Sequence, residues 1–141
     1  ENLRQLTDGV KGLIRLSPIP YILLKHVSQL IAPASFCMFD FNPDLSALSD
    51  ADWMMWFHRM ELLARTGIVP RIPELDRQVS VLKEMLQQDD GKYTKELSHL
   101  YFRKWSSYSG LMLEQDWRTS ERRINDLTFR SLLILHDANR L

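Results

Sequence analysis

The stretch Asp52-Trp-Met-Met-Trp-Phe-His-Arg-Met60 decides the fold, because it gathers two of the four tryptophans and three of the six methionines into nine residues. Ser49 precedes it as a candidate N-cap, with Asp52 at the capping-box position. Gly67 follows as a candidate C′ residue. From Trp53 to Ala64, large apolar residues recur three and four positions apart, the spacing of one helix face. The sequence therefore predicts an amphipathic helix between Ser49 and Gly67.

Working outward, the same apolar spacing predicts helices on both sides of this segment. Pro73 is suited to a first helical position, and Asp89-Asp90-Gly91 is expected to end the helix that follows it. The stretch from Ser106 to Gly110 is the expected break in the C-terminal part, so one kinked helix and two separate helices both remain open there. The further predicted helices cover residues 3–14, 21–31, 73–88, 93–108 and 113–138.

A single segment, Ser35-Phe-Cys-Met-Phe-Asp-Phe41, has the aromatic content of a strand. No second strand is evident to pair with it, so an extended apolar segment laid across the helices is expected. The predicted fold class is thus all-α: a single-domain bundle over residues 1–141, with five to six helices and the segment at about residues 35–41 packed across it.

Composition supports one globular domain and excludes several functional classes. The 141 residues are 45% hydrophobic and 26% charged, which is ordinary for a folded protein. Lys+Arg and Asp+Glu both number 18, so no overall charge attracts nucleic acid or an anionic membrane. Lys25 and His26 interrupt the longest apolar run, so no membrane span is expected. Cys37 is the only cysteine, which favours a cytoplasmic location. Because the chain begins with Glu1, we expect a processed or excised part of a longer protein.

Three small constellations resemble fragments of catalytic or metal sites. Glu96 and His99 have the E-x-x-H spacing of di-iron bundles, but no second such motif accompanies them. His136-Asp137 falls in a predicted last turn, where a histidine favourably caps the helix. Cys37 stands among aromatic residues that would raise its pKa and leave it unreactive. We therefore expect no catalytic residues, no metal and no cofactor.

The apolar surplus of the central helix leaves two interpretations: a core helix, or a surface that another protein covers. Trp, Met and Arg are enriched in interface cores, and further tryptophans lie beyond this helix. The leading hypothesis is a non-enzymatic protein–protein interaction or regulatory module, such as an adaptor, an inhibitor or an oligomerisation domain. Its partner would be another protein or a second copy. The candidate binding residues are Trp53, Met54, Met55, Trp56, Phe57, Leu62, Trp105 and Trp117.

Two alternatives come from other functional classes. A helical ligand-binding or sensor domain would line a pocket with the same aromatic residues, with His58 or His99 as a candidate axial ligand for haem. A nucleic-acid-binding module would use the arginines of the last predicted helix to follow a phosphate backbone. Acidic residues at i,i+4 spacing are expected to pair with several of them. The candidate nucleic-acid residues are Arg118, Arg122, Arg123 and Arg130, and the expected ion pairs are Glu114–Arg118, Arg122–Asp126 and Asp126–Arg130.

Overall fold

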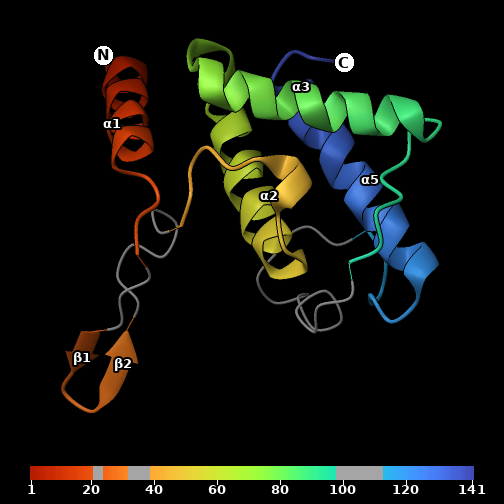
Figure 1. The fold of residues 1–141 in the computed structure, drawn as a ribbon, viewed down its shortest axis with the longest axis horizontal. Coiled ribbons are helices and arrows are strands. Elements are labelled where there is room, and N and C mark those ends of the chain that lie inside the picture. Colours follow the sequence, from red (N-terminus) through yellow and green to blue (C-terminus); the bar gives the residue numbers. More distant parts are fainter. Residues whose placement is uncertain (21–23, 32–38, 98–112) are drawn as a thin grey trace. The chain divides into compact units, whose positions relative to one another are not determined.

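The computed structural model describes residues 1–20, 24–31, 39–97 and 113–141. Their contacts divide the chain into two compact units, Glu1–Pro43 and Asp44–Leu141. The described part of the chain is mostly helical, and three of its four α-helices belong to the second unit (Figure 1). The all-α class is therefore correct, the predicted count of five to six helices is not confirmed, and the single domain stays a prediction.

In the first unit, helix α1 spans Asn2–Leu16, in agreement with the predicted helix at residues 3–14. It ends because Pro18 disfavours the helical conformation for its predecessor, and Ser17 is extended, with φ −68° and ψ 147°. The chain then runs antiparallel to a later segment. Ile19 and Phe39 exchange both backbone hydrogen bonds, and the Phe41 N–H donates to the Ser17 hydroxyl at 2.6 Å.

The helix predicted at residues 21–31 is wrong over its described part. Strand β1 (Leu24–His26) pairs antiparallel with strand β2 (Gln29–Ile31), so this stretch is a hairpin. Its two-residue turn has Val27 at φ 54°. Tight hairpin turns with a positive φ usually contain Gly or Asn, and valine rarely adopts that conformation. The sequence at Val27 therefore gives no indication of a turn. Without that signal, a short apolar run fits helical spacing equally well.

The extended segment expected at about residues 35–41 is described only at its end. Phe39 pairs with Ile19 in an isolated bridge although its own φ is 71°, so it is not an extended strand residue. The Asp40 carboxylate accepts from the Asn42 N–H at 2.8 Å as the chain turns. Residues 32–38 lie outside the described ranges. The packing of this segment across the helices therefore stays a prediction.

The second unit begins with the 3₁₀ turn η2 (Leu45–Ala47) and helix α2 (Asp50–Arg65). The predicted cap is confirmed: the Ser49 hydroxyl accepts from the Asp52 N–H at 3.3 Å and donates to the Asp52 carboxylate at 2.5 Å. Gly67 follows with φ 74°, and its N–H reaches the Ala64 carbonyl at 2.9 Å. Local signals in the sequence thus set both ends of α2.

Helix α3 (Pro73–Gln88) follows the 3₁₀ turn η3 (Val69–Arg71) and has the predicted limits. Beyond it, the helix predicted at residues 93–108 is wrong over residues 93–97, which are not helical. The Tyr93 N–H donates to the Thr128 hydroxyl at 2.9 Å, so this backbone is held by a distant helix and not by a turn of its own. The rest of that predicted helix, residues 98–108, lies outside the described part.

Helix α5 covers Ser120–Asp137, whereas the sequence predicts a helix from residue 113. Residues 113–119 instead fold back onto α5, where the Asp126 carboxylate accepts from the N–H of Leu113 at 2.6 Å and of Glu114 at 3.3 Å. Thr119 caps the helix by accepting from the Arg122 N–H. Helix α5 starts later than predicted because the N–H groups of Leu113 and Glu114 donate to the Asp126 side chain and not to backbone carbonyls of a helix.

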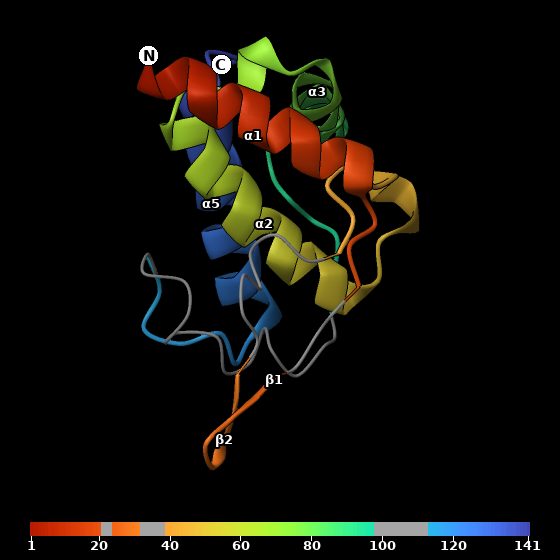
Figure 2. The same cartoon turned by 90° about the vertical axis from the view of Figure 1, so that its left-hand side faces the viewer.

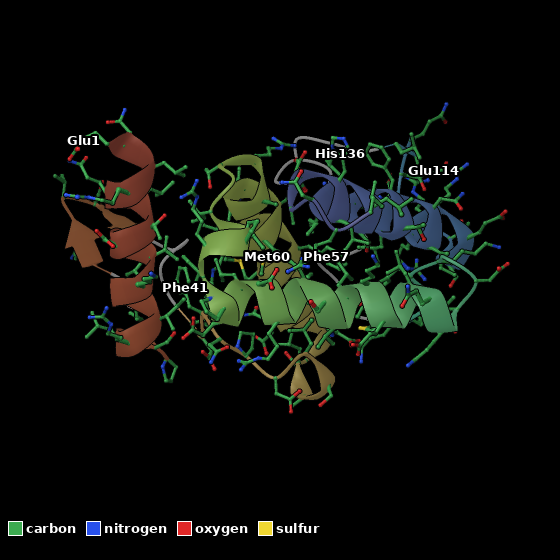
Figure 3. The ribbon with its side chains drawn as sticks, turned by 90° about the horizontal axis from the view of Figure 1, so that it is seen from above. Glu1, Phe41, Phe57, Met60, Glu114 and His136 are labelled. Atoms are coloured by element: carbon green, nitrogen blue, oxygen red, sulfur yellow. The ribbon has the colours of Figure 1, made fainter. Side chains whose placement is uncertain are left out.

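The core of the second unit lies among α2, α3 and α5. Helix α5 packs against both α2 and α3. Figure 1 shows α3 running across α2 and α5, and Figure 2 shows α3 nearly end-on. Seen from above, Phe57 and Met60 of α2 lie in the interior between these helices (Figure 3). Ser131 of α5 and Ala138, its C-cap residue, are small and buried, which lets neighbouring helices approach closely.

Candidate functional site

The aromatic residues of α2 form the centre of the core. Trp53, Trp56 and Phe57 are buried, and together with Tyr93 their rings meet at centroid distances of 5.2–5.7 Å, mostly edge to face. The Trp56 indole N–H donates to the Gln78 side-chain oxygen of α3 at 2.8 Å. This burial is what the core interpretation of the helix requires, and it leaves these three side chains little surface to offer a partner.

Trp117 is also buried, on the segment that precedes α5. Its indole N–H donates to the Asp126 carboxylate, and the Arg130 guanidinium lies 5.8 Å from the ring centroid. Such a cation–π contact is worth about 0.5–2 kcal/mol, depending on desolvation. Trp117 therefore joins the 113–119 segment to α5. Trp105, the remaining candidate tryptophan, lies outside the described residues.

A buried ion pair connects α2 to α5. The Arg130 guanidinium donates to the Glu61 carboxylate at 2.9 Å, and the Arg130 side chain is only 1% exposed. Glu61 also accepts from Arg65 at 2.7 Å. Burial lowers the pKa of Arg130, while the nearby carboxylates of Glu61 and Asp126 act in the opposite direction. Desolvation of both charges offsets much of their attraction, so such a pair adds little net stability, whereas removing one partner would leave the other charge buried and uncompensated.

The candidate nucleic-acid arginines are mostly engaged within the protein. Arg130 is buried against Glu61, and Arg122 donates to Asp116 at 2.8 Å. Arg123 donates to the Trp117 carbonyl at 2.9 Å and lies 3.3 Å from Glu96. Only Arg118, whose side chain is 85% exposed, presents most of its charge to solvent in this group. Neighbouring carboxylates interrupt the surface, which reduces the field that a phosphate backbone would meet.

Exposed apolar side chains lie on the outer sides of α2 and α5. Leu62 on α2 is 39% exposed, and Phe129 and Leu132 on α5 are 38% and 39% exposed. In the chain, Leu62 follows Glu61 and Phe129 precedes Arg130, so each is the sequence neighbour of one member of the ion pair that joins the helices. Met54 and Met55 of α2 are partly exposed. We call this set the outer surface: Met54, Met55, Leu62, Phe129 and Leu132.

Sequence reasoning identified the α2 part of the outer surface but missed Phe129 and Leu132. These two residues stand three positions apart, outside the buried stripe of α5 that contains Leu127, Ser131 and Ile134. An apolar pair on the opposite side from a helix's main stripe is the signal that could have found them. The sequence alone does not show which sides of α5 the neighbouring helices cover, so Phe129 and Leu132 could equally have been assigned to the core.

His58 lies between Met55 and Leu62 on α2 and is partly buried. Burial lowers the pKa of His58 below its ordinary value, and the positive charges of Arg130 and Arg59 lower it further, whereas Glu61 raises it. At the far end of α5, His136 Nδ1 lies 3.1 Å from its neighbour Asp137. Figure 3 shows Glu114 near the start of α5 and His136 at its end. His136 is exposed there, whereas His58 is partly buried.

Within the described ranges, no three His, Cys, Asp or Glu side chains are grouped so that they could hold a metal ion. Glu96 contacts Arg123 and Ser120, while its predicted partner His99 lies outside those ranges. No helix among the described residues is long and apolar enough to cross a membrane. Comparisons with known protein families, with curated proteins and with solved structures find no match to this chain.

Proposed function

We propose that this protein is a non-enzymatic, self-associating interaction module whose contact site is the outer surface of α2 and α5. The observation that carries the proposal is the exposure of Leu62, Phe129 and Leu132 on adjoining helices, beside partly exposed methionines. Methionine and aromatic residues are among the types enriched at interface cores. Each large apolar side chain removed from water contributes about 1.5–3 kcal/mol when fully buried.

A second copy of the same chain is the partner that this surface fits. The formal charge is zero, with 18 basic and 18 acidic residues, so two copies do not repel one another overall. Two-fold symmetry would place the Phe129 and Leu132 stripe of one copy against the same stripe of the other, which is the commonest form of homodimer interface. Antiparallel pairing of two α5 helices would also oppose their dipoles favourably.

The test is the mass of the full chain in solution, measured by light scattering over a concentration series. We expect a mass above that of the monomer, rising with concentration. The double variant Leu62→Ser/Phe129→Ser is expected to return to monomer while its thermal unfolding midpoint stays within a few degrees of the unaltered protein. The matched control is Leu141→Ser, because Leu141 is exposed and apolar but lies outside the outer surface.

Either of two association results would overturn the proposal, and so would a failure of the double variant to fold. One is a monomer at every concentration up to the millimolar range. The other is association that survives in the double variant, because then a different surface carries it. Loss of folding in the double variant would show that these side chains serve the core instead. Absorbance of the purified protein and binding to DNA at low salt test the ligand-binding and nucleic-acid alternatives on the same samples.

A further inference from the structure

We propose that Leu113 is a further apolar contact of the self-association site, held beside α5 by residues 113–119, which we call the strap. This inference rests on the proposed self-association, because it adds a residue to the same site. Three observations carry it: the polar contacts that fix the strap on α5, the exposure of Leu113, and the spacing of the exposed residues along α5.

The strap is fixed on α5 at its start and near its end. At the start, the N–H groups of Leu113 and Glu114 donate to the Asp126 carboxylate at 2.6 Å and 3.3 Å. Near the end, Trp117 is buried, and its indole N–H donates to the same carboxylate. The Arg123 guanidinium donates to the Trp117 carbonyl at 2.9 Å. The backbone of the strap is therefore in place before any partner binds.

This fixed backbone presents an apolar side chain to solvent. Leu113 is 63% exposed, more than Leu62, Phe129 or Leu132 of the outer surface. Ordering a mobile segment during association costs free energy, which reduces the affinity that its contacts provide. Here the hydrogen bonds of the folded chain have already ordered the segment. Burial of Leu113 against a partner would therefore contribute to affinity with little of that cost.

Leu113 lies near the start of the exposed face of α5. From Glu121 onward, the exposed residues of this helix recur three and four positions apart, which places them on one side: Glu121, Asn125, Phe129, Leu132 and His136. The Asn125 amide donates to the carboxylate of Glu114 at 2.8 Å, and Glu114 follows Leu113 directly in the chain. Phe129 stands one helical turn after Asn125. The strap thus extends, at its start, the face that continues with Phe129 and Leu132.

The pattern of this face fits a second copy of the chain. From Asn125 through Phe129 and Leu132 to His136, the spacing is four, three and four residues, which reads the same in both directions. Two antiparallel α5 helices related by a two-fold axis therefore place Phe129 of one copy opposite Leu132 of the other. The polar Asn125 and His136 then lie at the rim, as in most interfaces. Leu113 adds one apolar contact at each end of this arrangement.

The experiment measures the dissociation constant of the full chain by light scattering over a concentration series. Leu113→Ser is expected to raise the dissociation constant by about tenfold or more, because each dimer would lose two buried apolar side chains. Leu113→Met retains an apolar side chain of similar size and should retain most of the affinity. Leu141→Ser is the matched control, since Leu141 is 71% exposed but lies outside the outer surface, and it should leave the dissociation constant unchanged.

The outcomes separate this inference from the proposed function. A chain that dimerises equally well with and without Leu113→Ser overturns the role of Leu113 and leaves self-association intact. An unaltered chain that stays monomeric up to the millimolar range overturns both. Equal losses of affinity in Leu113→Ser and Leu113→Met, or in Leu113→Ser and Leu141→Ser, also overturn the role of Leu113. So does a Leu113→Ser variant that fails to fold, because its side chain would then serve the fold.

Discussion

At the scale of single residues, charged side chains of α5 reach partners that the sequence did not suggest. The expected i,i+4 pairs placed Asp126 between Arg122 and Arg130. In the structure Arg122 donates to Asp116, and Arg130 donates to Glu61, which is 69 positions away in the chain. Asp126 itself is buried and accepts hydrogen bonds from the segment that precedes the helix. A carboxylate that accepts several N–H bonds is a strong organising group in a core.

Asp126→Asn should therefore destabilise the protein by about 1.5–3 kcal/mol, the range for hydrogen bonds to a charged group. The amide retains one acceptor oxygen but turns a donor toward N–H groups that are donors themselves. Urea unfolding followed by tryptophan fluorescence measures the effect. Glu121→Gln, a similar change at an exposed position in the first turn of α5, should leave the midpoint unchanged. Equal midpoints for both variants would contradict the role assigned to Asp126.

At the scale of elements, α1 forms in spite of two glycines in its interior. A methyl group added at Gly9 or Gly12 would meet no atom within 4 Å, so packing does not require either glycine. Gly67 differs, because its φ of 74° lies in the left-handed region that ends α2. Glycine thus weakens one helix and terminates another, and the difference lies in the backbone conformation.

Gly9→Ala and Gly12→Ala should each stabilise α1 by about 1 kcal/mol, the difference in helix propensity between the two residues. Amide hydrogen exchange within α1 should slow about fivefold for each change. Gly67→Ala should act in the opposite direction and cost about 1–2 kcal/mol, because alanine is strained at positive φ. Faster exchange in α1 after either of the first two substitutions would show that the glycines fill a packing role.

At the scale of the whole molecule, the two compact units differ in how much apolar interior they contain. Val10 and Phe41 are the buried hydrophobic residues that the structure describes in the first unit. The second unit contains the aromatic cluster and the buried faces of α2, α3 and α5. All four tryptophans also belong to residues 44–141. The second unit therefore has the contacts that a self-sufficient core needs.

A chain consisting of residues 44–141 should fold without residues 1–43. We expect a cooperative transition with a tryptophan-monitored midpoint within a few degrees of that of the full chain, because the groups reporting the transition keep their partners. Circular dichroism confirms the helical content. Trp53→Ala in the same fragment should cost about 3–5 kcal/mol and serves as the destabilised reference. An unfolded fragment would show that the second unit depends on the first, in favour of the single domain predicted from the sequence.

The helices that the sequence predicted correctly are those whose ends have local causes. Ser49, Gly67, Pro73 and Gly91 act through their own backbone geometry or through partners a few residues away, so their effects are visible in the order of residues alone. The same holds for the end of α1 at Ser17-Pro18. The aromatic helix was also recognised, because an apolar stripe of that size needs to be covered wherever it lies.

The order of residues by itself thus determined that this is a helical protein built around the aromatic segment, and it located α1, α2 and α3. Only the tertiary structure decided that residues 93–97 and 113–119 are not helical. It also decided that Trp53 and Phe57 are enclosed while Phe129 and Leu132 are exposed, and that Arg130 pairs with Glu61. The physical reason is distance along the chain. The Thr128 hydroxyl accepts from the Tyr93 N–H, and the Asp126 carboxylate accepts from the Leu113 N–H. These hydrogen bonds require α5 to be in its folded position, so the spacing of neighbouring residues in the sequence does not predict them.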